Sequence, residues 1–262
     1  MPVTQSIKVV LLDIEGTTTS ISFVSEVLFP YVRHELSNFL DRHFDSDETQ
    51  ADIEALRQLS KSDLSAGVDS AVQIPEAGSD KSAIKDAVCK NVFAQMDVDR
   101  KSTALKQLQG HIWRHGFESK ELQGDLYDDA MEAFKFWKSH HIPIYIYSSG
   151  SIAAQKLLFG YNKNGDLSSF LVDHFDTTIG SKVEEESYHK IFDQILKSNL
   201  VPNLTKKEVL FGTDNIKEAI AADKAGLSTI LSVRPGTAPL PADHPFHAVT
   251  TFADFSKYFN FQ

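Results

Sequence analysis

Lys8-Val-Val-Leu-Leu-Asp13-Ile-Glu15-Gly16-Thr17-Thr18-Thr19 is the stretch of sequence that decides the fold of this chain. Its first part is an apolar run without polar alternation, which is typical of a strand buried on both faces of a parallel sheet. Asp13 then lies just past the carboxyl end of that strand, where open α/β sheets bind their ligands. Two carboxylates so close together, beside a turn rich in hydroxyl and N–H donors, predict a site for a hard cation and a phosphate. The structural alternative is an acid that ends the strand and only caps a turn.

The composition excludes several classes of partner. The chain has 262 residues and a net charge of −10, which argues against nucleic acid and anionic membranes, because both attract a basic surface. Cys89 is the only cysteine, so an internal disulfide is excluded, as suits a reducing compartment. No apolar run approaches the roughly 18 residues of a membrane span, and residues 1–8 do not form a secretory signal. We expect a cytoplasmic protein, with the nucleus as a second compartment, and a monomer.

The order of the predicted elements indicates two domains. Helical periodicity without a convincing strand fills roughly a hundred residues after the first strand, which is too long for a single crossover. From Leu126 onward strands alternate with helices, the strands falling at residues 142–147, 174–179, 208–211 and 228–233, with a last one near Val249. This rhythm predicts an α/β fold with a doubly wound parallel sheet. We assign residues 1–21 and 122–262 to the α/β core domain and residues 22–121 to an inserted helical cap domain.

Side chains suited to phosphate chemistry stand at successive strand ends, where a doubly wound sheet brings them together. They are Asp13 and Glu15, Ser148 and Ser149, Lys182 in a loop, and Asp214. A carboxylate can attack phosphorus, a second acid can exchange protons, and a lysine can neutralise the transferring group. Hydroxyl and N–H groups bind phosphate oxygens, and several acids suit Mg²⁺. Taken singly, either serine or Asp214 is as well explained as a helix cap, and Lys182 as a solvated charge.

In order, spacing and strand context these residues resemble the haloacid-dehalogenase-like superfamily. Residues 13–19 are similar to the opening motif of the enolase-phosphatases (acireductone synthases) of methionine salvage. Residues 99–113, 145–160 and 174–188 resemble the cap segment, the second core motif and the lysine loop of that family. The similarity runs from about Val9 to Pro235.

The resemblance implies a role for each site residue. Asp13 is the expected phosphoryl acceptor, Mg²⁺ is expected at Asp13, Glu15 and Asp214, and the substrate phosphate at Ser148, Ser149 and Lys182. The catalytic residues are then Asp13, Glu15 and Lys182. The implied enzyme enolises 2,3-diketo-5-methylthiopentyl-1-phosphate, a small phosphorylated diketone, and hydrolyses the phosphate to give an acireductone.

Two positions depart from the usual superfamily pattern. Glu15 stands where most of these phosphatases have Asp, and we hypothesise that its longer side chain serves as acid and base in both steps. Asn215 stands where many relatives have a second acid, and we expect it to orient a metal-bound water.

Alternative functions remain open at this stage. The chain could be a Mg²⁺-dependent phosphatase of another small phosphate ester, or a non-catalytic binding protein on the same fold. A dehalogenase is disfavoured because that reaction gives no reason for a Mg²⁺ site. The orientation of His111 and Trp113 in the cap, toward substrate or core, is also open, whereas the pair His140-His141 is interpreted as a helix C-terminal feature.

Overall fold

A computed structural model describes residues 5–69 and 71–262 of the chain. Contacts divide the chain into two compact units, one of Met1–Glu26 with Gln123–Gln262 and one of Val27–Leu122. Residues 1–4, which the sequence assigns to the core domain, lie outside the described residues. The second unit is one continuous stretch of chain inserted into the first, and its role as a cap stays a prediction.

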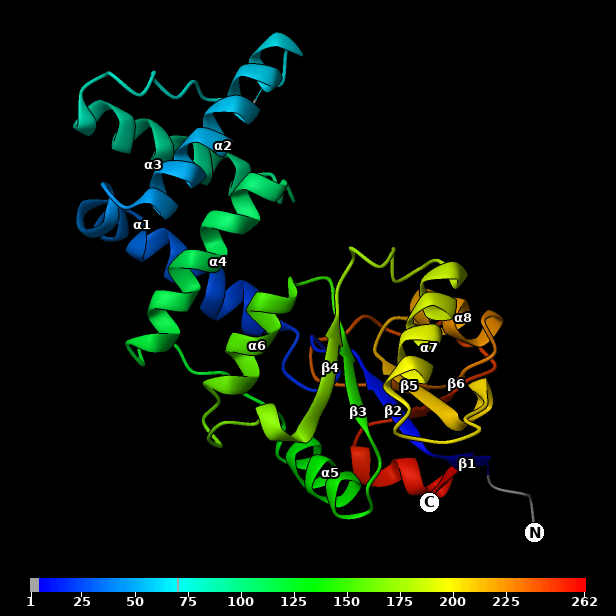
Figure 1. Cartoon of the computed structure of the whole chain (residues 1–262). Coiled ribbons are helices and arrows are strands. Elements are labelled where there is room, and N and C mark those ends of the chain that lie inside the picture. The colour runs from blue at the N-terminus through cyan, green and yellow to red at the C-terminus, as the bar shows by residue number, and fades with distance from the viewer. Residues whose placement is uncertain (1–4, 70) are drawn as a thin grey trace. The chain divides into compact units, whose positions relative to one another are not determined.

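The first unit is built on a six-stranded parallel sheet with the strand order β4-β3-β2-β5-β6-β7 (Figure 1). All four residues of β2 are buried, as the apolar run predicts. Leu12 of β2 pairs with Ile146 on one side and Gly212 on the other, and the strand order reverses here, so β2 marks the topological switch point. The strands are β2 (Val9–Leu12), β3 (Ile144–Tyr147), β4 (Leu171–Phe175), β5 (Val209–Thr213), β6 (Ser228–Ser232) and β7 (His247–Val249).

Helices cover both faces of this sheet. On one face, Leu11 of β2 shares a buried apolar cluster with Tyr188 of α7 and Ala222 of α8. On the other, the ring of Phe255 in the 3₁₀ helix η4 lies beside Gly212 of β5 and packs on α5. Two buried faces confirm the predicted doubly wound architecture. The elements are α5 (Asp128–Ser139), α6 (Ile152–Gly160), α7 (Glu185–Ser198), α8 (Ile216–Lys224) and the 3₁₀ turns η2 (Ser168–Phe170), η3 (Lys206–Glu208) and η4 (Phe252–Lys257).

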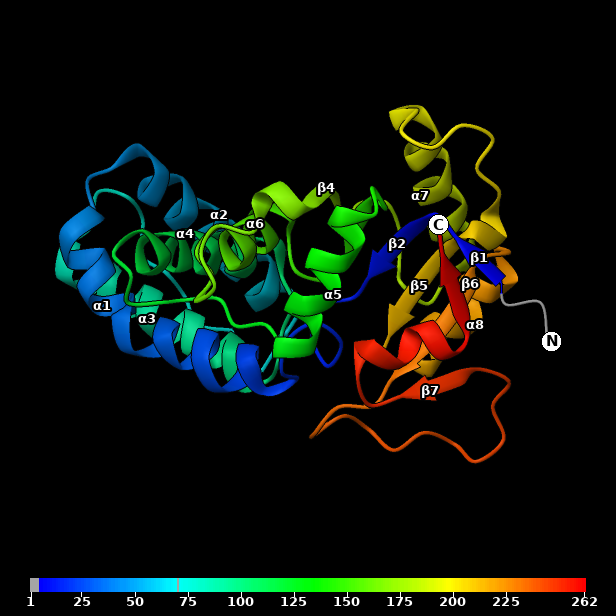
Figure 2. The ribbon, with the colours of Figure 1, turned by 90° about the horizontal axis from the view of Figure 1, so that it is seen from below.

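Two features of the first unit differ from the sequence-based expectation. A separate parallel pair joins β1 (Gln5–Ile7) to β8 (Phe259–Phe261), near the C-terminus in Figure 2. The strand predicted at residues 174–179 instead ends at Phe175. The cause is Asp176, whose carboxylate accepts the N–H groups of Ile152 and Thr178 and turns the chain away.

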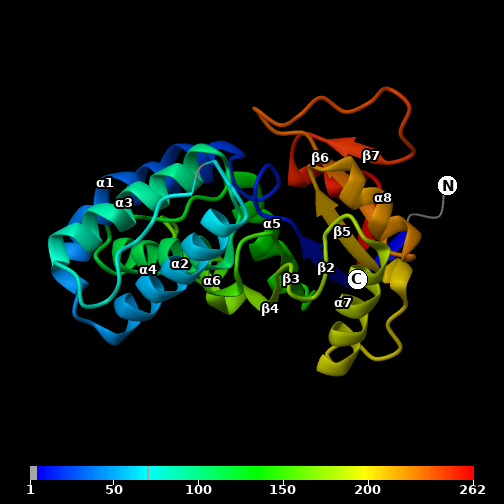
Figure 3. The same cartoon turned by 90° about the horizontal axis from the view of Figure 1, so that it is seen from above.

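The second unit contains α1 (Phe29–His43), α2 (Asp47–Ser65), α3 (Lys81–Asp97) and α4 (Thr103–Glu118), and the π-helical turn η1 (Val24–Leu28) precedes α1 (Figure 3). Three of these helices begin at a capping side chain, Ser46, Asp80 and Ser102, each accepting an N–H three residues further on. The apolar stripe of α1 packs into a core that this unit forms by itself. Within the described residues, no helix is both long and apolar enough to cross a membrane.

Candidate active site

Asp13 lies at the carboxyl edge of the sheet, directly after β2. Its N–H donates to the carbonyl of Gly212 at 2.9 Å, which continues the ladder between β2 and β5 by one rung. Its carboxylate is buried, and Oδ1 accepts the N–H of Ile14 at 2.7 Å. The same oxygen lies 2.5 Å from Nζ of Lys182. Both the main chain and the side chain of Asp13 are therefore held in place.

Lys182 comes from the loop between β4 and α7, and hydroxyl groups hold that loop. The hydroxyl of Tyr147 donates to the carbonyl of Gly180 at 2.9 Å, and that of Tyr188 donates to the carbonyl of Lys182 itself at 2.6 Å. The lysine is only 8% exposed, which excludes the solvated loop charge considered above. A tyrosine of β3 and a tyrosine of α7 thus hold the loop that directs the ammonium group toward Asp13.

A second buried carboxylate, Glu218 in the first turn of α8, completes the surroundings of this ammonium group. Its Oε2 lies 2.8 Å from Nζ of Lys182 and accepts the hydroxyl of Thr213 at 2.8 Å. Burial alone would lower the pKa of Lys182, but the carboxylates of Asp13 and Glu218 raise it above its ordinary value. Burial, and next the charge of Asp13, raise the pKa of Glu218. The sequence-based reasoning missed Glu218, because an acid in a helix is usually solvated and no local pattern marks this one as buried.

Asp214 follows β5 and lies against the turn that contains Gly16. A Cβ placed on Gly16 would lie 2.5 Å from Oδ2 of Asp214, and the φ of Gly16 is +70°. Burial and the nearby charge of Asp13 raise the pKa of Asp214 to about 6. The N-cap of α8 is Asn215, whose side chain accepts the N–H of Lys217 at 3.0 Å. The helix-cap alternative therefore fails for Asp214, because Asn215 caps the helix. That Asn215 also orients a metal-bound water stays a prediction.

Ser148 and Ser149 follow β3, the other neighbour of β2. The N–H of Ser148 donates to the carbonyl of Phe175 at 3.1 Å, and its hydroxyl accepts the N–H of Gly150 at 3.3 Å. The residue that caps α6 is Ser151, which accepts the N–H of Ala154 at 3.3 Å. The cap alternative therefore fails for both serines. Ser148 is buried and Ser149 exposed, at the edge of the sheet that also carries Asp13.

Glu15 lies in the turn that follows Asp13 and is half-buried. The carbonyl of Ile14 accepts the N–H groups of Thr17, Thr18 and Thr19, at distances of 2.9 to 3.2 Å, so the turn is compact. Glu15 also forms an isolated bridge with Thr19. The backbone of the turn thus holds Glu15 close to Asp13, two residues before it in the sequence.

The donor set suits a divalent oxygen-binding cation. Asp13, Asp214 and Glu218 bring three carboxylates around the single ammonium group of Lys182, a surplus of two negative charges when all are ionised. Among the described residues no three His, Cys, Asp or Glu side chains converge in metal-binding geometry. Asp13 and Asp214 therefore supply at most two side-chain ligands. Main-chain oxygens and water would have to fill the other positions of a bound cation, which suits Mg²⁺ because it dehydrates reluctantly.

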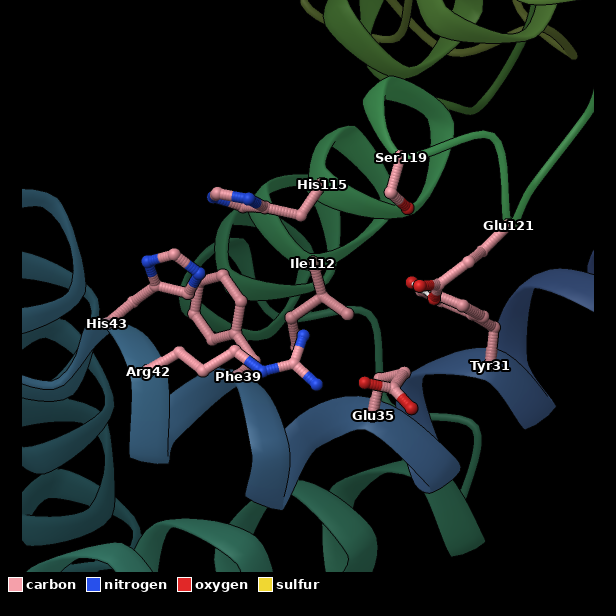
Figure 4. A pocket seen from close by; sticks show the side chains of 9 residues that line it. All are labelled: Tyr31, Glu35, Phe39, Arg42, His43, Ile112, His115, Ser119 and Glu121. Atoms are coloured by element: carbon pink, nitrogen blue, oxygen red, sulfur yellow. Dashed lines mark hydrogen bonds between the residues drawn. The ribbon is translucent and has the colours of Figure 1, made fainter.

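The second unit contains a polar pocket of its own between α1 and α4, with a volume of about 90 Å³ (Figure 4). At one end the hydroxyl of Tyr31 donates to Glu121 at 2.8 Å, and burial together with Glu121 and Glu35 raises the pKa of this phenol. At the other end the rings of His43 and His115 lie 4.3 Å apart, and burial and the neighbouring ring lower the pKa of His115. The volume is roughly that of a few water molecules.

His111 and Trp113, whose orientation the sequence left open, both have partners inside the second unit. Nδ1 of His111 lies 2.6 Å from the buried carboxylate of Asp52. The indole N–H of Trp113 donates to the carbonyl of Leu28 at 2.9 Å. These contacts tie both side chains of α4 to α2 and η1 within the second unit.

Comparison with known proteins places this chain in a family. The haloacid dehalogenase-like hydrolase family matches residues 7–226. The chain is 48% identical to the enolase-phosphatase E1 of Naegleria gruberi, over 94% of this chain and 93% of that protein. It is also 48% identical to a probable bifunctional methylthioribulose-1-phosphate dehydratase/enolase-phosphatase E1 of Vitis vinifera, over 94% of this chain but 46% of that protein. The chain thus spans about half the length of such plant relatives.

Solved structures give the same result for the fold. The UTR4 protein of Saccharomyces cerevisiae matches with a TM-score of 0.71 and 34% identity, over 94% of this chain and 99% of that one. The HAD-hydrolase YfnB of Bacillus subtilis, in a form bound to magnesium, matches with a TM-score of 0.55 over 97% of this chain and 99% of that one. At 13% identity the second likeness supports the fold alone.

Proposed function

The chain belongs to the haloacid dehalogenase-like hydrolases and, among them, to the enolase-phosphatase E1 family, and from this premise we propose that it is an active, Mg²⁺-dependent enolase-phosphatase. Its substrate is 2,3-diketo-5-methylthiopentyl-1-phosphate, and its products are an acireductone and phosphate. The observation that carries the proposal is the buried ion pair between Asp13 and Lys182, with Asp214 and the two serines at neighbouring strand ends.

Asp13 is the nucleophile. Within the described part of the chain, both contacts of its carboxylate fall on Oδ1, so we assign the attack on phosphorus to Oδ2. The bond from phosphorus to the substrate oxygen breaks as the bond to Asp13 forms. Lys182 neutralises the charge that accumulates on the transferring group, and Ser148 and Ser149 hold the other phosphate oxygens. Asp13, Asp214 and the main chain of Glu15 would hold Mg²⁺, which would supply further neutralisation of charge on the phosphoryl group and the substrate.

Glu15 exchanges the protons in this proposal. As an acid it protonates the leaving oxygen, and as a base it then takes a proton from the water that hydrolyses the aspartyl phosphate. In the preceding enolisation it removes a proton from the carbon beside the carbonyl group. A glutamate has one methylene more than the usual aspartate, which supports this longer reach.

The remaining assignments belong to the same proposal. The helical unit acts as a cap domain, the protein works in the cytoplasm with the nucleus as a second compartment, and it is a monomer. The lone Cys89 supports a reducing compartment. Sedimentation of the purified chain at increasing concentration measures the oligomeric state directly.

A two-readout assay tests the function. The diketone phosphate is incubated with the chain and Mg²⁺ while ultraviolet absorbance reports the enediol product and a colour reaction reports phosphate. We expect both signals, and we expect Asp13→Asn to abolish phosphate release. Phosphate release from other esters but no enediol signal indicates the alternative phosphatase. No turnover of any phosphate ester by the wild type indicates the non-catalytic binding protein.

The role of Glu15 has its own test. Glu15→Gln preserves the size of the side chain but cannot accept or release a proton at neutral pH, so both enolisation and dephosphorylation should fall by about 100-fold or more. Exchange of the substrate C–H proton with deuterated solvent reports the first step separately. If exchange continues at the wild-type rate while dephosphorylation is lost, Glu15 does not act in enolisation.

A further inference from the structure

The turn of residues 13–19 carries the proposed nucleophile, and its shape depends on contacts outside the turn. Inside it, the carbonyl of Ile14 accepts three N–H groups, and the N–H of Gly16 donates to the carbonyl of Thr19 at 2.9 Å. The carbonyls of Thr17 and Thr18 point away from this network and find partners elsewhere. Thr18 accepts the N–H of Tyr127 at 3.0 Å. The partner of Thr17 comes from a segment that follows another strand of the sheet.

That partner is Arg234, which follows β6, two strands away from β2. Nε of Arg234 donates to the carbonyl of Thr17 at 3.3 Å, and Nη1 donates to the carbonyl of Thr250 at 2.8 Å. Nη2 lies 2.8 Å from Oδ2 of Asp129 in the first turn of α5. One side chain thus joins the turn of residues 13–19 to the ends of two other elements.

The guanidinium group is buried and lies over two aromatic rings. Its central carbon lies 4.4 Å from the ring centroid of Tyr127 and 5.0 Å from that of Phe252, and Arg234 is 7% exposed. A buried cation is costly unless it is paired, and contact with two rings together with two hydrogen bonds and an ion pair in separate directions is a geometry that lysine cannot reproduce. The surroundings therefore require an arginine at this position, and another positively charged residue would not make the same contacts.

We propose that Arg234 is a positioning residue for the active site, which fixes the turn of residues 13–19 through the carbonyl of Thr17. The inference rests on the proposed role of Asp13 as the nucleophile. Within the described chain, the hydrogen bonds and ion pair of Arg234 reach no side chain that we assign to the reaction. Its effect on Asp13 is transmitted from Thr17 through the main chain of the three residues between Asp13 and Thr17.

Arg234→Lys is the variant that tests the proposal. Lysine keeps the charge and can still pair with Asp129, but it cannot also donate the two separate hydrogen bonds to Thr17 and Thr250 while it lies over both rings. A nucleophile displaced by about 1 Å can cost roughly 100-fold in rate, so we expect kcat to fall on that order. KM and inhibition by inorganic phosphate should change less than about threefold, because Ser148 and Lys182 do not contact Arg234.

Asp129→Asn is the matched control. It removes the negative charge next to the guanidinium group and should lower stability, yet it leaves the bond from Arg234 to Thr17 in place. We expect kcat within about threefold of the wild type. A merely structural role of Arg234 predicts the opposite pattern, in which both variants lose kcat in proportion to their loss of stability, and that result would overturn the proposal.

Amide hydrogen exchange separates this inference from the proposed activity. Exchange at residues 14–19 should accelerate in Arg234→Lys and stay near the wild-type rate in Asp129→Asn, at a temperature where both are folded. This pattern supports the positioning role even if the wild type turns over no substrate, in which case the proposed function alone fails. Unchanged exchange at these residues in Arg234→Lys overturns the positioning role even if the wild type is active.

Discussion

Gly16→Ala provides a direct test of how the turn after Asp13 shapes the cation site. The glycine has a φ of +70°, and an added Cβ would lie 2.5 Å from Oδ2 of Asp214 and 2.9 Å from Cγ2 of Thr237. Gly67 offers a matched control, because its φ is +69° and a Cβ there would meet nothing within 4 Å. The two substitutions impose the same backbone strain, and only the first displaces a site residue.

The magnitudes follow from these two geometries. A left-handed conformation costs an L-residue about 1 to 2 kcal/mol, and the lower entropy of the unfolded alanine chain offsets about 0.4 to 1 kcal/mol. Gly67→Ala should therefore lower the free energy of unfolding by about 1 kcal/mol and leave turnover unchanged. In Gly16→Ala, the Asp214 oxygen must also retreat by about 0.9 Å to pass from 2.5 Å to the 3.4 Å of ordinary contact. A displacement of about 1 Å costs roughly 100-fold in rate.

The assay is phosphate release at a series of Mg²⁺ concentrations, with thermal unfolding of each variant. We expect Gly16→Ala to need more Mg²⁺ for half-maximal rate and to reach a kcat lower by about two orders of magnitude. Wild-type turnover at wild-type Mg²⁺ concentrations in Gly16→Ala would refute the reasoning. So would an equal loss of turnover in Gly67→Ala, because backbone strain alone would then account for the effect.

The remaining predictions concern the pH dependence of stability and the packing of α4. The pKa of Asp214 in the folded protein is about 6, above the ordinary carboxyl value of about 3.9, so the folded state binds this proton more tightly than the unfolded chain. Without metal, its contribution to stability should be present below about pH 4 and lost as the pH rises through 6. Urea midpoints across this range should show a slope that Asp214→Asn or saturating Mg²⁺ removes, and an identical slope in the variant would contradict the assignment. Within α4, an added Cβ on Gly116 would lie 2.6 Å from Cζ of Tyr31, whereas one on Gly110 would meet nothing within 4 Å. Gly110→Ala should raise the free energy of unfolding by about 1 kcal/mol and Gly116→Ala should lower it by about 1 to 3 kcal/mol; equal midpoints in thermal unfolding would show that Tyr31 moves aside freely.

The elements that could be predicted from the sequence are those that a single short stretch of residues specifies by itself. The run Val9–Leu12 has no polar residue, so its burial on both faces and the exit of Asp13 at its end could be read directly from the sequence. The pairing of β1 with β8 could not, because three-residue strands at opposite ends of the chain carry no periodicity. The end of β4 was missed for another reason. Asp176 overrides the β-forming tendency of the residues that follow it by bonding to nearby N–H groups.

The active-site residues also differ in whether a local sequence pattern could reveal them. Ser148, Lys182 and Asp214 could be proposed because each follows a strand, and strand ends meet at one edge. Glu218 lies inside a helix, where an acid is usually solvated, and only the fold shows that it is buried against Lys182. Arg234 has no local signal, because its partners Thr17, Asp129 and Thr250 come from three separate parts of the chain.

The buried charges around Lys182 are better explained by chemistry than by stability. An ion pair removed from water loses about as much in hydration as it gains in attraction, and apolar residues of similar volume often stabilise a protein as well or better. The sheet follows that rule in β2, where all four residues are apolar, whereas buried charges stand just beyond the strand ends. There, three carboxylates surround one ammonium group, and burial and mutual repulsion raise the pKa values of Asp214 and Glu218. Such an arrangement is unfavourable in the protein alone and becomes favourable when a divalent cation occupies it. The unfolding temperature should therefore rise with added Mg²⁺ in the wild type and not in Asp214→Asn, with no substrate present.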